Sequence, residues 1–111
     1  VLILDETYNA GLESMLASLK LLAQTPGKRH IAVLGTMKEL GDWSVAYHQQ
    51  VGEQVKALNL DGLLILADED EAKAMSIGAS PISSEQFATH ADVVSRLKEM
   101  VQPGDRLLFK A

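Results

Sequence analysis

Residues 30–41 read HIAVLGTMKELG, and this stretch decides the fold. His30 to Leu34 form a short apolar run with β-branched side chains that stops at Gly35, which is typical of a buried parallel strand ending in a tight turn. A polar loop then runs to Gly41, where a new helix is indicated. Because ligands of α/β proteins bind outside the carboxyl ends of the strands, this loop is a candidate site, although an ordinary strand-loop-helix joint has the same pattern.

The composition is that of a single globular domain. The 111 residues suffice for one domain with a real core, and 47% hydrophobic with 23% charged residues exclude a largely disordered chain. The net charge of -5 is mild, and the ten Lys and Arg residues are scattered without interleaved aromatic residues. Nucleic acid is therefore not an expected partner.

Residues that commonly hold metals are few and dispersed. The chain has no cysteine, which excludes thiolate metal sites, and its histidines stand far apart at His30, His48 and His90. We predict no metal site on this chain. No apolar run approaches the roughly 20 residues that cross a bilayer, and no leader-like segment precedes the fold. We expect a cytoplasmic monomer without membrane insertion.

Both ends of the chain lie inside predicted strands. Val1 to Leu4 read as a buried strand, and Leu107 to Ala111 stop as another strand ends. Natural termini are usually polar and frayed. We therefore expect residues 1–111 to be one excised domain of a longer protein.

Strands and helices alternate along the chain. Apolar runs predict strands at 1–4, 30–34, 63–66 and 106–110, and helical spacing predicts helices at 12–23, 42–58, 68–77 and 91–101. This alternation predicts a Rossmann-like three-layer α/β domain with a mostly parallel sheet of five or six strands. Right-handed crossovers bring the loops 5–9, 35–41 and 67–70 and the end at Lys110 to one edge of that sheet.

Some positions in these elements are predicted in more detail. Asp42 is the expected N-cap of the second helix. The inward positions of that helix are predicted to be Val45, His48, Val51, Gly52, Val55 and Leu58. Those of the last helix are predicted to be Val94, Leu97 and Val101. Residues 78–83 resemble a short edge strand, since Pro81 cannot donate to a ladder, and Ser84 is expected to cap a turn through Phe87.

Two polar segments follow predicted strands. Asp5, Tyr8 and Asn9 combine a carboxylate, an aromatic ring and an amide, a set that suits a nucleotide but equally suits ordinary helix capping. The acidic run 68–71 is interpreted as a solvated helix start that complements the helix dipole, with a metal site as the minor alternative.

Familiar catalytic loops are missing from the sequence. It contains no G-x-x-x-x-G-K-[ST] phosphate loop, no G-x-G-x-x-G after the first strand and no serine in a G-x-S-x-G elbow. We predict no catalytic residue on this chain and expect it to act together with a partner domain.

Two motifs carry a resemblance to a known family. DETYNAGLESM (5–15) and PGKRHIAVLGTMKELG (26–41), followed by HQQVG (48–52), resemble the carboxy-terminal domain of the Mur ligases. The corresponding family patterns are approximately D-D-[ST]-Y-N-A-N-P-x-S-M and G-D-M-x-E-L-G. Residues 107–111 match the start of a segment reading approximately L-V-K-G-S-R. The resemblance covers essentially the whole chain.

The resemblance implies a three-domain, ATP-dependent peptide ligase of peptidoglycan synthesis. The reaction it implies adds D-alanyl-D-alanine to UDP-N-acetylmuramoyl-tripeptide through an acyl phosphate. An amino-terminal domain for the UDP substrate and a central domain holding ATP and Mg²⁺ would both lie outside residues 1–111. This domain would close over ATP on the central domain and help to bind the incoming dipeptide, and by itself it would be inactive.

The resemblance also assigns residues. Those assigned to nucleotide binding are Asp5, Tyr8, Asn9 and Lys110. Those assigned to substrate binding or closure are Gly35, Thr36, Met37, Glu39 and His48. Glu6, Gly11-Leu12, Thr36 and Ala111 depart from the family pattern. Two alternatives remain open: a Mur-type ligase for another amino acid or peptide, and a non-catalytic Rossmann-like module that binds a nucleotide or a protein.

Overall fold

The fold is a five-stranded parallel sheet. The computed structural model describes residues 2–5 and 11–111, with strand β5 inserted between β1 and β2 in the order β1-β5-β2-β3-β4. The described strands are β1 (Leu2–Asp5), β2 (Arg29–Gly35), β3 (Gly62–Leu66), β4 (Ser84–Gln86) and β5 (Asp105–Lys110). Every pair of neighbouring strands is parallel. The predicted fold class is confirmed, and the run from His30 to Leu34 lies in the central strand.

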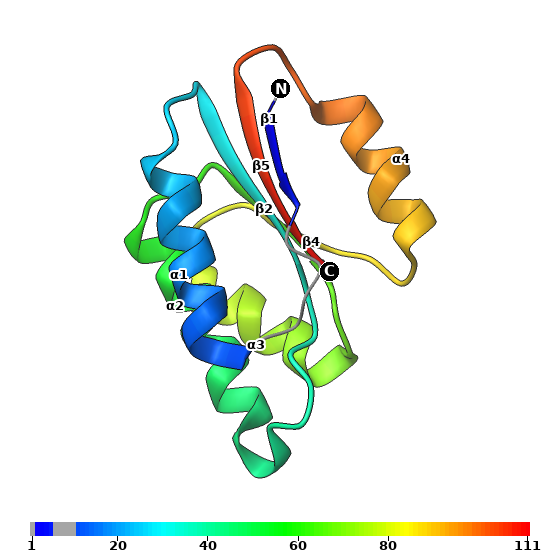
Figure 1. Cartoon of the computed structure of the whole chain (residues 1–111). Helices are drawn as coiled ribbons and strands as arrows, with labels where there is room; N and C mark the ends of the chain where they lie inside the picture. Colours follow the sequence, from blue (N-terminus) through cyan, green and yellow to red (C-terminus); the bar gives the residue numbers. More distant parts are fainter. Residues whose placement is uncertain (1, 6–10) are drawn as a thin grey trace.

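Helices cover both faces of the sheet. They are α1 (Gly11–Gln24), α2 (Ser44–Ala57), α3 (Glu69–Ala79) and α4 (His90–Met100), with a short 3-10 helix η1 (Gly41–Trp43) before α2. Figure 1 shows α1, α2 and α3 on one side of the sheet and α4 on the other. The three-layer arrangement is thus unequal, with most of the helical mass on one face.

Each face has its own apolar core. The larger core packs α1, α2 and α3 on the sheet through fully buried side chains such as Leu19, Val51 and Met75. The smaller core packs α4 on the opposite face through Val93 and Leu97. Successive residues of β2 alternate between the two cores, as the pleat of a strand requires.

Helices α2 and α3 touch along their backbones at two glycines. A Cβ built at Gly52 would overlap the carbonyl oxygen of Met75 and lie 2.9 Å from the amide nitrogen of Ala79. A Cβ at Gly78 would overlap the carbonyl oxygen of Gln49 in return. The two glycines therefore set the distance between α2 and α3.

The second and last helices differ from their predicted details. Asp42 is not an N-cap, because Gly41–Trp43 form a 3-10 turn and α2 begins at Ser44 without a side-chain cap. Val45 is 46% exposed, since it lies on the outer side of that first turn. For α4 the predicted inward positions Leu97 and Val101 do pack against the smaller core, but Val94 is 42% exposed and the buried valine is Val93.

The segment after α3 was predicted wrongly. Gly78 and Ala79 continue α3, and Pro81 lies in the connection rather than in an edge strand. Strand β4 is Ser84–Gln86, where a capped turn was expected, and it pairs with β3. A polar three-residue strand carries no apolar periodicity, so only its pairing with β3 reveals it.

The first strand is less buried than predicted. Strand β1 pairs with β5 at the edge of the sheet, and Leu2 and Ile3 are 45% and 56% exposed. Leu4 alone among the described apolar residues of β1 packs against the larger core. An apolar run thus predicted the strand but not its position at the edge.

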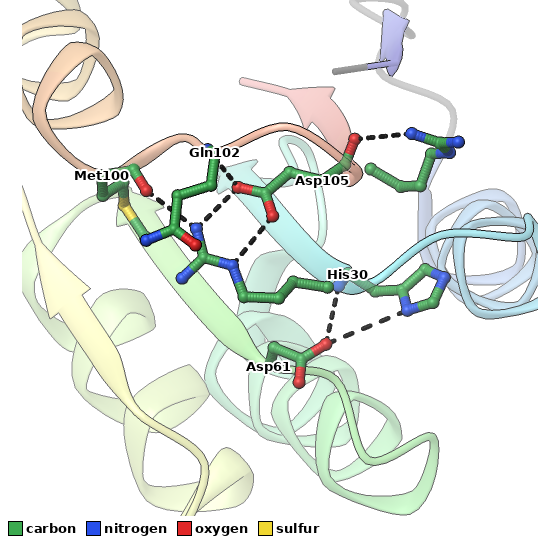
Figure 2. A network of polar contacts seen from close by, with 7 residues as sticks. His30, Asp61, Met100, Gln102 and Asp105 are labelled. Atoms are coloured by element: carbon green, nitrogen blue, oxygen red, sulfur yellow. Dashed lines mark hydrogen bonds and ion pairs between the residues drawn. The ribbon is translucent and has the colours of Figure 1, made fainter.

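An ion pair joins β2 and β5 at the amino ends of these two strands. The guanidinium of Arg29 donates two hydrogen bonds to the carboxylate of Asp105, at 2.8 and 2.6 Å, and a third to the carbonyl oxygen of Met100 (Figure 2). The amide of Gln102 also donates to Asp105. The hydrogen bonds from Arg29 lower the pKa of Asp105, although its burial acts in the opposite direction.

Removing the charge of Asp105 is expected to destabilise the chain. Asp105→Asn should lower the free energy of unfolding at pH 7 by about 2 to 4 kcal/mol, because it leaves Arg29 with an uncharged, poorly matched partner. The folded-state pKa of Asp105 lies below the unfolded value of about 3.9. Its contribution is therefore complete above that pH and is lost as the pH falls toward the folded-state pKa.

Urea unfolding of the 111-residue chain between pH 7 and pH 3 measures this contribution. The exposed Asp42→Asn is the matched control, expected to stay within about 0.5 kcal/mol of the wild type. Asp105→Asn should also flatten the acid limb of the stability curve. Equal losses for the two variants at pH 7 would show that the ion pair contributes nothing specific.

Candidate functional site at the carboxyl ends of the strands

A cavity of about 680 Å³ opens at the carboxyl ends of the central strands. Its lining comes from the end of β2 with the loop that follows, the end of β3, the first turns of α2 and α3, the start of α4, the end of β5 and one residue of α1. The lining residues are Met15, Gly35, Thr36, Met37, Lys38, Glu39, Leu40, Gly41, Ser44, Leu66, Asp68, Glu71, His90, Lys110 and Ala111. The predicted meeting of residues 35–41 with 67–70 and Lys110 at one edge is confirmed.

The ends of β2 and β5 approach each other closely at this edge. A Cβ built on Gly35 would lie 3.0 Å from the Cα of Ala111, so the close approach favours glycine here. Lys110 follows Leu108 by two positions and therefore lies on the same face of the sheet as α1, α2 and α3. Although Lys110 lines the cavity, it is only 7% exposed.

The loop after β2 is sharply bent. Glu39 has a φ of 62° and Gly41 a φ of 58°, both in the left-handed region. That region is natural for glycine but costs a residue such as glutamate roughly 1 to 2 kcal/mol. Lys38 and Glu39 are exposed, whereas Met37 is buried in the larger core. The side chain of Met37 thus anchors the loop in the core, while the charged side chains of Lys38 and Glu39 line the cavity.

Side chains from α2 and the loop itself hold this bend in place. The amide of Met37 donates to Nε2 of His48 at 2.9 Å, and Nδ1 of His48 donates to the carbonyl oxygen of Ser44 at 2.7 Å. The hydroxyl of Thr36 accepts a hydrogen bond from the amide of Asp68. The loop is therefore tied to the helix that follows it, α2, and to the neighbouring connection between β3 and α3.

A hydrogen bond also connects the starts of α2 and α3 at the cavity. The hydroxyl of Ser44 at the start of α2 donates to Glu71 in the first turn of α3 at 3.1 Å. Asp68, immediately before α3, lines the cavity beside them. Lys38 and Lys110 also line the cavity. The cavity therefore offers groups of both charges, as a ligand with an ammonium and an anionic group requires.

The structure brings together most of the predicted site residues. Gly35, Thr36, Met37, Glu39 and Lys110 all line the cavity. His48 is fully buried behind the loop and contacts it without lining the cavity. The backbone of Asp5 ends β1 opposite Phe109 of β5. Tyr8 and Asn9 lie outside the described residues.

Sequence reasoning missed several lining residues. Glu71 was interpreted as part of a helix start, and Ser44 and His90 were not predicted to belong to a site, although all three line the cavity. The position of Asp68 and Glu71 after a buried strand was a usable signal, because every such position lies at the same edge of a parallel sheet. Nothing in the local sequence marks His90, which reaches the cavity from the opposite face through the start of α4.

Two further observations bear on cofactors and membranes. Across residues 2–5 and 11–111, no group of three or more His, Asp or Glu side chains is arranged to hold a metal ion. The acidic run 68–71 begins α3, as its interpretation as a helix start requires. None of the described helices combines the length and the apolar character needed to cross a bilayer.

A parallel sheet with helices on both faces defines a Rossmann-like α/β domain, and the charged cavity lies at the edge of the sheet where such domains bind ligands. The family model for the Mur ligase, glutamate ligase domain matches residues 1–111, and the chain belongs to this family. The family resemblance inferred from the two motifs is thereby confirmed.

Individual relatives agree with this assignment. The chain is 59% identical over its full length to the UDP-N-acetylmuramoyl-tripeptide--D-alanyl-D-alanine ligase of Synechocystis sp., of which it covers 24%. It is 39% identical to the ligase of the same name from Escherichia coli over 90% of this chain and 21% of that protein. The crystal structure of MurF ligase from Thermotoga maritima in complex with ADP matches with a TM-score of 0.77 and 35% identity, over 98% of this chain and 24% of that one. The chain spans about a quarter of the length of these relatives.

Proposed function

We propose that this chain is the carboxy-terminal domain of an ATP-dependent ligase that adds D-alanyl-D-alanine to UDP-N-acetylmuramoyl-tripeptide in peptidoglycan synthesis. The observation that carries the proposal is the 59% identity over the whole chain to a ligase of that name, together with a cavity where the family motif and Lys110 meet. The remaining domains of such an enzyme would lie outside residues 1–111.

The cavity suits the amine partner of this reaction. A dipeptide at neutral pH carries an ammonium and a carboxylate. Glu39, Asp68 and Glu71 offer carboxylates to the first, and Lys38 and Lys110 offer cations to the second or to a phosphate. The charges thus match a zwitterionic substrate beside an anionic one.

The chemistry of ATP would be supported from outside this chain. The sequence has no Walker phosphate loop, and the described residues do not include a set that fits Mg²⁺. What this chain contributes is a wall that covers the reacting groups, excludes water and so protects an acyl phosphate from hydrolysis. Asp5, Tyr8 and Asn9 are proposed nucleotide contacts because they match the first family motif. The ADP in the structure of the relative is bound to that protein.

An amine-competition assay on the complete enzyme tests the proposal. With ATP, Mg²⁺ and UDP-N-acetylmuramoyl-tripeptide, equal concentrations of D-alanyl-D-alanine, D-alanine and D-glutamate would be offered together, and the products would be identified by mass spectrometry. We expect the pentapeptide product to dominate.

The other outcomes identify the alternatives. A dominant product from another amine would make this a Mur-type ligase of different specificity. No product with any amine, from an enzyme that still binds ATP, would favour a non-catalytic nucleotide-binding module.

A further inference from the structure

We propose that His48 is a positioning residue that holds the loop 35–41 in the shape that ligation requires. The inference rests on the proposed function. It concerns a residue that lies behind the cavity wall and does not line the cavity.

The hydrogen bonds of His48 define its state. Its Nδ1 must carry a proton, because its partner, the carbonyl oxygen of Ser44, can only accept. Its Nε2 must then be the acceptor for the amide of Met37. The ring is a neutral imidazole with both nitrogens satisfied, and it links the first turn of α2 to the loop.

The loop needs such an anchor. Glu39 adopts a left-handed conformation two residues after Met37, and a strained residue persists only where its surroundings fix it. On one side the loop is tied by Thr36 to Asp68. On the other, the described anchor is the bond from the amide of Met37 to His48. Without this hydrogen bond, the buried amide of Met37 loses its acceptor. Leaving a buried donor unsatisfied costs free energy, which favours a rearrangement of the loop.

A rearranged loop would change the cavity directly. Residues 35–41 supply about half of its lining, including Glu39. A shift of about 1 Å in groups that position a substrate can cost on the order of 100-fold in rate. His48 would thus act on the reaction through the loop without touching a reacting atom.

Two amide substitutions separate the two bonds of His48. The amide of glutamine reaches the place of Nε2, so His48→Gln retains an acceptor for Met37. The amide of asparagine reaches only the place of Nδ1, so His48→Asn retains the donor to Ser44 and loses the acceptor. Both variants bury a neutral amide on the side chain of residue 48 and differ in which nitrogen of the imidazole that amide replaces, which makes them a matched pair.

The experiment uses the complete ligase. It measures kcat with D-alanyl-D-alanine, hydrogen exchange of the peptide that contains Met37, and thermal unfolding to confirm that both variants are folded. We expect His48→Asn to lose about 100-fold in kcat and to exchange faster at Met37. His48→Gln should stay within about five-fold of the wild type and keep its protection.

Each other result decides against part of the account. Equal losses of kcat in the two folded variants, or unchanged protection of Met37 in His48→Asn, would overturn the positioning role. If His48→Asn does not fold, His48→Gln alone decides, and a large loss of kcat or of protection there rejects the inference. A wild-type enzyme without ligase activity overturns the proposed function instead, and the exchange comparison still decides whether His48 holds the loop.

Discussion

Replacing Gly52 by alanine should lower the free energy of unfolding by about 3 kcal/mol. Alanine is the better helix former by about 1 kcal/mol, so the substitution would stabilise an isolated helix. Here the added methyl group meets backbone atoms of Met75 and Ala79, which cannot rotate away as a side chain would. Helices α2 and α3 would have to separate, and overpacking of this kind costs 1 to 3 kcal/mol or more.

The same argument applies to Gly78, with one further consequence. Gly52 and Gly78 face each other's helices, so a single separation of α2 from α3 relieves both clashes. The double variant should therefore lose clearly less stability than the sum of the two single losses. Additive losses would mean that the two glycines report on independent contacts.

Urea unfolding of the chain measures these values, with Gly62→Ala as the matched control. A Cβ at Gly62 would make ordinary contacts, at 3.8 Å, with the side chain of Ile31. We expect that control to change stability by less than about 1 kcal/mol. A loss at Gly52 no larger than that of Gly62 would contradict the close contact of α2 with α3.

The spacing of α2 and α3 also matters for the cavity. Ser44 and Glu71 are joined by a hydrogen bond at the ends of these helices, and both line the cavity. Separating the helices at Gly52 and Gly78 would weaken that bond. The glycine pair thus contributes to the geometry of the candidate site from two helical turns away.

Much of the fold could be predicted from periodicity alone. The apolar residues 31–34 and 63–65 are buried, and a continuous apolar run of this kind is a clear sequence signal of a strand that is covered on both faces. Strand β4 could not be found in this way, because Ser84–Gln86 is polar and is a strand only through its pairing with β3. Choosing Val94 instead of Val93 was an error at one position, since Leu97 and Val101 were placed correctly and either of two adjacent valines can be fitted to the same helical face.

The residues that meet at the candidate site could be predicted in outline, but the hydrogen bond that holds its loop in place could not. Strand ends implied that Gly35, Thr36 and Lys110 would meet, because a parallel sheet gathers its strand-to-helix loops at one edge. The role of His48 behind the loop depends on a tertiary hydrogen bond to Met37. No sequence pattern encodes such a bond.

Lys110 provides the second large expected effect. It is 7% exposed and lines the cavity at the end of β5, beside the glycine that ends β2. Under the proposed function the cavity receives anionic groups. A cation held beside such groups stabilises developing negative charge, and removing one such group typically costs 100- to 1,000-fold in rate. Methionine keeps much of the aliphatic stem, so Lys110→Met removes the charge with little loss of packing.

Lys56 is the matched control for this substitution. It is an exposed lysine in the last turn of α2, three helical turns from Ser44, or about 18 Å along the helix. Lys56→Met removes the same charge from the same domain at a distance from the cavity. It should therefore leave the rate of ligation within about two-fold of the wild-type rate.

The central claim is that the cavity at the carboxyl edge of this sheet belongs to the active site of the ligase. The most direct test is kcat/KM for D-alanyl-D-alanine in the complete enzyme with Lys110→Met and with Lys56→Met. We expect a fall of at least about 100-fold for Lys110→Met, in a variant that thermal unfolding shows to be folded. An unchanged kcat/KM in folded Lys110→Met would contradict the claim.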